Sequence, residues 1–252
     1  MMDDIMIAVI TAVLAGAYAA LLVLYLRAEK HNDGSFGFKK ATAVKLTLSL
    51  LFCAVALISY CLVVFNPIRS AIGPTAHLFI LLGLFAALPG DYFLQYIRLD
   101  VKKYITGILC FSATQALLIA ALILLYPPGT AGWVSVVIIT LGILFVMLSI
   151  MKKQNWQLGR ERAVLTAYTI LLAFMTAKAI HSVIANLSVS SLLFAAGAVF
   201  FLISDILLGI WNYHTGRRRH ANLNWITYFT GMFLIALSIM PAFLTPLQHF
   251  EF

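Results

Sequence analysis

The sequence predicts an all-α integral membrane protein, a bundle of eight transmembrane helices forming a single domain over residues 1–252. Hydrophobic residues make up 63% of the chain and charged residues 10%, whereas a soluble domain carries about 45–50% apolar and about 25% charged residues. The apolar residues fall into eight runs, each close to the roughly 20 residues that cross a bilayer core. This composition argues against soluble, disordered and nucleic-acid-binding proteins.

In chain order, the predicted spans cover residues 5–26, 42–65, 77–96, 104–126, 132–151, 163–184, 190–212 and 224–246. The first follows the acidic Met-Met-Asp-Asp. Asn66-Pro67 ends the second, and Pro127-Pro128-Gly129 separates the fourth from the fifth. Aromatic residues that anchor helices at the membrane interface lie near the ends of the later spans; they are Trp133, Trp156, Trp211 and Trp225.

The basic residues predict the orientation. Fourteen of the 17 Lys and Arg residues lie in four alternate connections, 27–40, 97–103, 152–162 and 213–223, and the opposite connections hold only Arg69. Because Lys and Arg concentrate in cytoplasmic loops, we expect these four connections in the cytoplasm and both termini on the non-cytoplasmic side. The expected location is the cytoplasmic membrane of a bacterium.

Two carboxylates lie deep in the predicted spans, Asp91 in 77–96 and Asp205 in 190–212. An ionisable group at this depth costs about 2.5–3.5 kcal/mol on insertion scales, and such groups mark functional sites. Both spans run inward, and at 1.5 Å per residue both carboxylates lie about 9–12 Å below the cytoplasmic interface. We therefore expect them to share a cavity, the alternative for each being a structural hydrogen bond between helices.

Other polar side chains reach a similar depth. Lys45 and Tyr228 lie one turn into the second and eighth spans from the predicted cytoplasmic side. Tyr168 lies near the cytoplasmic end of the sixth span, and Gln115 lies nearer the middle of the fourth. A Lys near a helix end often extends to water, and Tyr often lies at the interface. Their shared level nevertheless favours a polar cluster around the two carboxylates.

The segments Gly83–Asp91 and Gly197–Asp205 match at glycine, leucine and aspartate with an offset of 114 residues. Each belongs to the third helix of one half of the chain, so the match suggests a parallel four-plus-four repeat with the site between the halves. Gly83, Ala87 and Asp91 fall on one face of the first helix, and Gly197, Phe201, Asp205 and Gly209 on one face of the second. We call each set the aspartate stripe of its helix; its small residues let neighbouring helices approach closely. Pro89 kinks a helix, which membrane helices tolerate best beside a polar cavity.

The sequence predicts neither a metal nor a cofactor. Its six His residues lie in loops or at span ends, so they form no zinc-ligand cluster at membrane depth. The chain also has no Gly-x-Ser-x-Gly elbow, phosphate loop or dinucleotide fingerprint. These absences argue against a metal hydrolase and a serine lipase.

Three segments resemble those of the YhhN-type membrane proteins, whose characterised members are lysoplasmalogenases. They are Gly83-Leu84-Phe85…Gly90-Asp91, Ser204-Asp205-Ile206-Leu207-Leu208 and Thr227-Tyr228-Phe229. The sequence departs from the family pattern at three positions. The second span starts with Lys45-Leu46 rather than Lys-Pro, Gln115 replaces a His, and Met232 replaces a Gln.

The resemblance implies hydrolysis of the vinyl ether bond of lysoplasmalogen to a fatty aldehyde and a glycerophospho-alcohol. This chemistry needs one carboxylic acid and one carboxylate, and the resemblance assigns these roles to Asp91 and Asp205 in an order left open. The partner is a lysophospholipid from the bilayer, with its headgroup at the basic inner surface near Lys45. The expected substrate-binding residues are Lys45, Gln115, Tyr168, Ser204 and Tyr228.

Two other functions stay open from the sequence. A proton-coupled transporter or lipid flippase would use paired intramembrane carboxylates to carry protons. A non-catalytic, lipid-binding member of the family would fit the three departures. Release of aldehyde by the purified protein separates hydrolysis from both.

Overall fold

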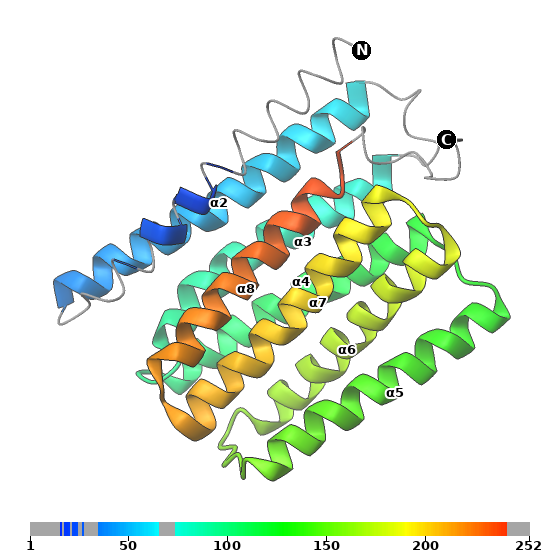
Figure 1. Cartoon of the computed structure of the whole chain (residues 1–252). Coiled ribbons are helices and arrows are strands. Elements are labelled where there is room, and N and C mark those ends of the chain that lie inside the picture. Colours follow the sequence, from blue (N-terminus) through cyan, green and yellow to red (C-terminus); the bar gives the residue numbers. More distant parts are fainter. Residues whose placement is uncertain are drawn as a thin grey trace.

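The chain folds as a bundle of long helices joined by short connections (Figure 1). The computed structural model describes residues 35–65 and 74–240, together with Gly16, Arg27 and residues 18–20 and 22–24. The first predicted span, 5–26, therefore lies mostly outside the described residues, although those described within it are helical. Within these ranges the fold is all-α, as the sequence predicts.

The helices are α2 (Ser35–Phe65), α3 (Pro74–Phe93), α4 (Val101–Leu125), α5 (Thr130–Lys153), α6 (Arg162–Ala185), α7 (Val189–Ile210) and α8 (Arg218–Leu237). A 3₁₀ turn, Leu94–Tyr96, follows α3, and a π-helical turn, Trp211–Thr215, follows α7. In the described part of the chain, six helices are long and apolar enough to cross a membrane. They are α2 to α7, because α8 begins with basic and polar residues. The protein is thus a multi-pass membrane protein; the eight-span count and the side of the termini stay predictions.

The predicted spans from 42–65 to 190–212 coincide with α2 to α7, but the outermost described helices differ at their ends. Helix α2 begins at Ser35, so it extends beyond the start of the apolar run at residue 42. The last span, predicted at 224–246, is a helix over Arg218–Leu237. Pro241 follows closely in the sequence, and proline lacks an N–H and disfavours helical backbone in the residue before it.

Six helices form a closed ring. Going around it, the neighbours are α2, α3, α4, α6, α7 and α8, and α8 packs back on α2. Helix α5 lies outside this ring and packs on α6, at the edge opposite α2 (Figure 1). The contacts have an internal correspondence: replacing α2, α3 and α4 by α6, α7 and α8 turns each packed pair of the ring into another packed pair. This is the arrangement expected of a parallel repeat with α3 and α7 in equivalent places.

Helices α7 and α8 approach each other closely at Gly197 and Gly231. A Cβ on Gly197 would lie 2.7 Å from the carbonyl oxygen of Gly231, and a Cβ on Gly231 would lie 2.7 Å from that of Gly197. Any side chain at either position would therefore force the two backbones apart, which explains the glycine on the stripe that leads to Asp205.

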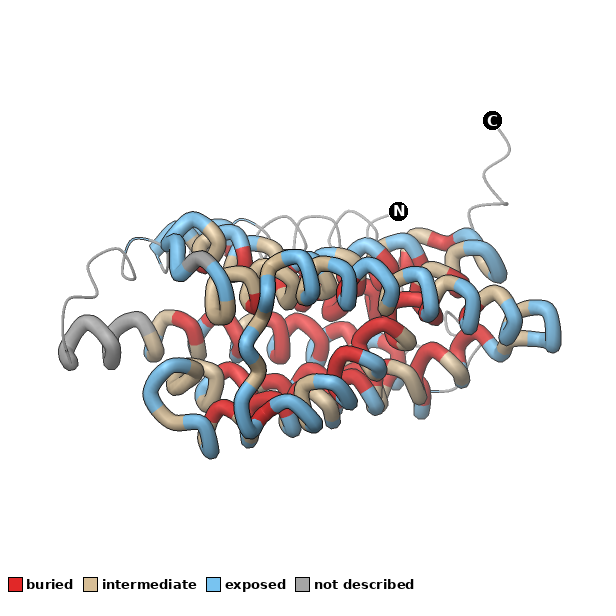
Figure 2. The backbone as a smooth tube through the Cα atoms, turned by 90° about the horizontal axis from the view of Figure 1, so that it is seen from below, coloured by how far each residue is buried: buried red, intermediate tan, exposed pale blue. Residues whose placement is uncertain are grey.

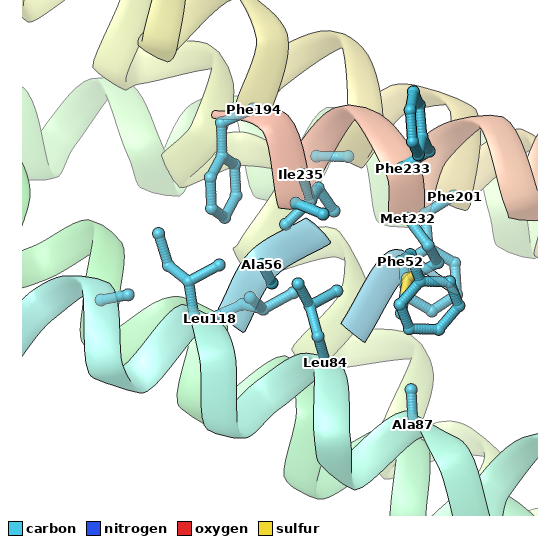
Figure 3. Packing of buried hydrophobic residues seen from close by; sticks show 14 of the residues in the cluster. Phe52, Ala56, Leu84, Ala87, Leu118, Phe194, Phe201, Met232, Phe233 and Ile235 are labelled. Carbon is cyan, nitrogen blue, oxygen red and sulfur yellow. The ribbon is translucent and has the colours of Figure 1, made fainter. Parts of the chain in front are cut away.

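The apolar core fills the ring. Buried residues follow the inward faces of the helices (Figure 2). In the close-up, α2 and α3 face α7 and α8 through interdigitated side chains, including Phe52, Leu84 and Ile235 (Figure 3). The ring is therefore packed shut over this length, so a cavity can open only towards an end.

The two ends of the bundle differ in charge. The connections 94–100, 154–161 and 211–217 lie at one end, where nearby basic residues are Arg98, Lys102, Lys103, Lys152, Lys153, Arg160, Arg162, Arg217, Arg218 and Arg219. The described connections at the other end, 126–129 and 186–188, contain no Lys or Arg. We call the first end the basic end.

Candidate active site

A cavity of about 260 Å³ opens within the ring at the basic end. Every ring helix contributes to its wall, and α5 adds Met147 and Met151. Both Asp91 and Asp205 line it. Two carboxylates separated by 114 positions in the sequence therefore face one space, and most of the remaining wall is apolar or aromatic.

Asp91 lies in the last turn of α3, where three side chains hold its carboxylate. The Ser49 hydroxyl and the Tyr228 hydroxyl donate to Oδ2 at 2.6 and 2.8 Å. The Lys45 ammonium lies 3.3 Å from Oδ1 and also donates to the Asp91 backbone carbonyl at 3.2 Å. Asp91 is 1% exposed, so its charge is balanced by a cation inside the protein rather than by water.

Asp205 lies on α7 and has a different set of neighbours. The Tyr168 hydroxyl from α6 donates to Oδ2. The hydroxyl of the adjacent Ser204 lies 3.4 Å from Oδ1, but it also donates to the Phe201 carbonyl at 2.8 Å. No cationic side chain in the described ranges forms an ion pair with Asp205, which is partly exposed to the cavity. A carboxyl group in these surroundings is well placed to hold a proton.

Three aromatic rings line the cavity beside the carboxylates. Phe111, Phe201 and Tyr228 meet pairwise edge to face, with ring centroids 5.6 to 5.9 Å apart. All three side chains line the cavity. Such rings provide a dry, preshaped wall, and their faces attract positive charge.

The structure brings together three of the five expected substrate-binding residues. Lys45, Tyr168 and Tyr228 line the cavity. Ser204 is fully buried and outside the lining, and its backbone carbonyl accepts a hydrogen bond from Asn224 at 2.7 Å. Gln115 is also fully buried, lies beside Tyr168 and makes no hydrogen bond with a described residue.

The surroundings of Lys45 bear on its expected headgroup contact. Its ammonium is committed to Asp91, and the residue is only 6% exposed. The structure therefore places Lys45 as the counterion of Asp91.

The cavity is also lined by several residues that the sequence did not assign to the site. They are apolar, lie near helix ends or come from connections, and include Tyr104, Met147, Met151, Trp156, Trp211, Tyr213 and Asn224. Trp156 is held by a tight fit: a Cβ on Gly209 would lie 1.9 Å from its ring. Gly209 belongs to the aspartate stripe of α7, so its spacing was a usable signal, but its partner in a connection was not predictable.

Within residues 35–65 and 74–240 and the few described before them, no group of three or more His, Cys, Asp or Glu is placed to hold a metal ion. The aspartates instead have hydroxyl and ammonium donors as partners. The absence of a metal from the reaction stays a prediction.

The model of the YhhN family matches residues 40–239, which include α3 to α8 and nearly all of α2. The chain belongs to the YhhN family. No curated protein and no solved structure matches the chain. The matched range covers both carboxylates and all the cavity residues named above, so this cavity belongs to the part of the chain that defines YhhN membership.

Proposed function

We propose that this YhhN protein is a membrane-embedded hydrolase that cleaves the vinyl ether bond of lysoplasmalogen, with an ethanolamine or choline headgroup. The observation that carries the proposal is the pairing of two unlike carboxylates on one cavity wall, one with a cation and one without. Vinyl ether hydrolysis needs such a pair, because it begins by protonating carbon and passes through a cation.

The different surroundings suggest the roles. Asp205, with a phenol donor and no described cation, is the general acid: its proton goes to the β carbon of the vinyl ether, and the alkene electrons form the new C–H bond. The resulting oxocarbenium ion is stabilised by ionised Asp91, which the Lys45 ammonium keeps charged. Tyr228 and Ser49 hold that carboxylate in place.

Water then adds to the α carbon, and its proton passes to Asp91. The hemiacetal collapses as its C–O bond to glycerol breaks: the glycerol oxygen takes a proton from Asp91, and the hemiacetal hydroxyl loses its proton to water. The net reaction consumes one water and yields one aldehyde and one alcohol. The apolar wall, including Met147 and Met151, suits the first carbons of the alkenyl chain, and the basic end suits the phosphate.

Purified protein in nanodiscs, supplied with lysoplasmalogen, should release a fatty aldehyde. In D₂O the aldehyde should carry one deuterium on the carbon next to the carbonyl, because the acid delivers a solvent-derived proton there. The matched substrate is the saturated alkyl ether, which lacks the alkene and should not react. Aldehyde absent from the vinyl ether reaction, or cleavage of both ethers, would contradict the proposal.

A proton-coupled transporter or flippase would instead move lipid or solute across proteoliposomes without aldehyde, and a lipid-binding protein would do neither. The same preparation distinguishes these outcomes. The Asp91→Asn form is the control for contaminating hydrolases, because it keeps the shape of the side chain.

A further inference from the structure

A third carboxylate lies at the basic end, outside the membrane-spanning helices. Glu161 is the residue before α6 and is 7% exposed. The first N–H groups of a helix lack partners within the helix, but the side chain of Glu161 makes no cap hydrogen bond to them. It turns back, and its Oε1 accepts the N–H of Gly159 at 3.2 Å.

The same oxygen is the end of a chain of hydroxyl groups. The Tyr213 hydroxyl donates to Glu161 Oε1 at 3.0 Å, and the Tyr104 and Tyr213 hydroxyls lie 3.2 Å apart. Both tyrosines line the cavity. Tyr104 and Asp205 face this same cavity, so the chain leads from a connection at the basic end towards this carboxylate.

Three features hold Tyr213 in this position. It belongs to the π-helical turn after α7, and π-turns are frequent at functional sites. Its ring stacks on Trp156 with centroids 5.4 Å apart, and Trp156 itself fits against Gly209. The turn into Trp156 uses Asn155 with φ of 55°, a conformation that Asn adopts more readily than most residues.

We propose that Glu161, Tyr213 and Tyr104 form a path that returns a proton from the basic end of the bundle to Asp205 after each turnover. This inference rests on the proposed function. There, Asp205 gives its proton to carbon, and the hemiacetal later loses its hydroxyl proton to water. Asp205 is then left ionised and must be reprotonated before the next substrate can react.

The transfer along the path conserves protons. Glu161 takes one from water at the basic end and passes it to the Tyr213 oxygen; Tyr213 passes its own to Tyr104, and Tyr104 passes its own through a cavity water to Asp205. No described residue donates to Glu161 Oε2, which leaves that oxygen for exchange with water. These three are proton-transfer residues that do not touch the bond that breaks.

The test separates the first turnover from later ones. Glu161→Gln and Tyr213→Phe should leave the single-turnover rate, measured with excess protein, within about twofold of wild type. They should lower the multiple-turnover rate by about tenfold, less than the about 10²–10⁴-fold that a group acting in the chemical step contributes. Small carboxylic acids or imidazole added to the buffer should restore the multiple-turnover rate, because they can deliver the missing proton.

Tyr92→Phe is the matched control. It also removes a tyrosine–tyrosine hydrogen bond near the end of α3, at 3.2 Å to Tyr96, but it lies outside the cavity lining. We expect it to behave as wild type. Equal loss of single and multiple turnover without rescue by buffer would make the chain structural and overturn the inference.

Unchanged multiple turnover in Glu161→Gln and Tyr213→Phe would mean that Asp205 recovers its proton directly from the hemiacetal, which also overturns the inference but leaves the proposed function intact. If wild type releases no aldehyde, the proposed function fails and the proton path falls with it. If Glu161→Gln does not fold, Tyr104→Phe tests the same path from the cavity side.

Discussion

Asp91 and Asp205 occupy matching positions on α3 and α7, yet the structure surrounds them differently. Asp91 is almost fully covered and has an ammonium, a phenol and a serine hydroxyl as partners. Asp205 faces the cavity with a phenol and a weakly placed serine. Among the described residues, the two carboxylates thus differ chiefly by one cation, and under the proposed mechanism this lysine distinguishes the base from the acid.

The largest effect on turnover is expected when either carboxylate is neutralised. Asp91→Asn and Asp205→Asn should each lower turnover by at least about 100-fold, because a positioned acid or base contributes about 10²–10⁴-fold. The double variant should lose much less than the product of the two, since groups that act as a unit are not additive. Aldehyde release, with size-exclusion profiles to check folding, measures both effects.

The pH dependence of the residual rates of the two variants distinguishes the acid from the base. An acid must be protonated, so its contribution is lost as pH rises; a base must be ionised, so its contribution is lost as pH falls. Asp205→Asn should therefore lose the high-pH decline of the wild-type profile, and Asp91→Asn the low-pH decline. The opposite pattern would exchange the roles, and near-normal turnover in either folded variant would make that aspartate structural.

Removing the cation should make the two carboxylates more alike. Lys45→Met should lower kcat by about tenfold or more, because hydrogen bonds to charged groups contribute about 1.5–3 kcal/mol. The effect should fall on kcat rather than on KM, since the Lys45 ammonium, although it lines the cavity, is paired with the Asp91 carboxylate.

Lys178→Met provides the control for this change. Lys178 is also fully buried, but it donates to the Tyr126 carbonyl at 2.6 Å and lies outside the cavity lining. We expect its kcat to stay near that of wild type. A raised KM with unchanged kcat in Lys45→Met would restore the headgroup contact expected from the sequence.

A smaller effect is expected from the tyrosine hydroxyl that each carboxylate has as a partner. Tyr228→Phe and Tyr168→Phe each remove one hydroxyl donor from a carboxylate and keep the ring. Each should reduce turnover by up to about tenfold, less than loss of the carboxylate, because part of the donor set remains at both sites. Tyr60→Phe, in α2 and outside the cavity, should have no effect. Full activity in both tyrosine variants would show that these hydroxyl donors do not affect turnover by Asp91 and Asp205.

The smallest effect is expected at Gln115. Its amide is fully buried without a described hydrogen-bond partner, and an unsatisfied buried polar group costs about 1–3 kcal/mol. Gln115→Met keeps the approximate volume, so it should raise the melting temperature or leave it unchanged, with turnover within about threefold of wild type. A strong loss of activity would indicate that the amide contacts bound substrate.

Hydrophobic runs predicted most of the described helices, because a lipid environment demands long apolar helices and the connections between them are short. The carboxylates were predictable for a related reason: a charge at membrane depth stands out against an apolar sequence. Lys178 was less predictable, since its distance from the span end does not reveal that its ammonium donates to the carbonyl of Tyr126, directly after α4.

The cavity wall was less predictable. Phe111 and Phe201 look like any core phenylalanine in the sequence, and only the ring of helices brings them against Tyr228. Glu161 lies in a basic connection, where a carboxylate looks like an ordinary solvated charge. Side chains from connections and the pairing of helices distant in sequence depend on tertiary packing, which periodicity does not encode.

The ion pair of Lys45 with Asp91 also bears on whether the lysine would react with the aldehyde product of the proposed reaction. Fatty aldehydes condense with free amines to form imines, and a cavity that releases them would expose its own lysine to this reaction. An ammonium held 3.3 Å from a carboxylate has no lone pair with which to attack a carbonyl. The same contact that charges Asp91 would therefore shield the site from self-inactivation by its product, as long as the lysine keeps its proton.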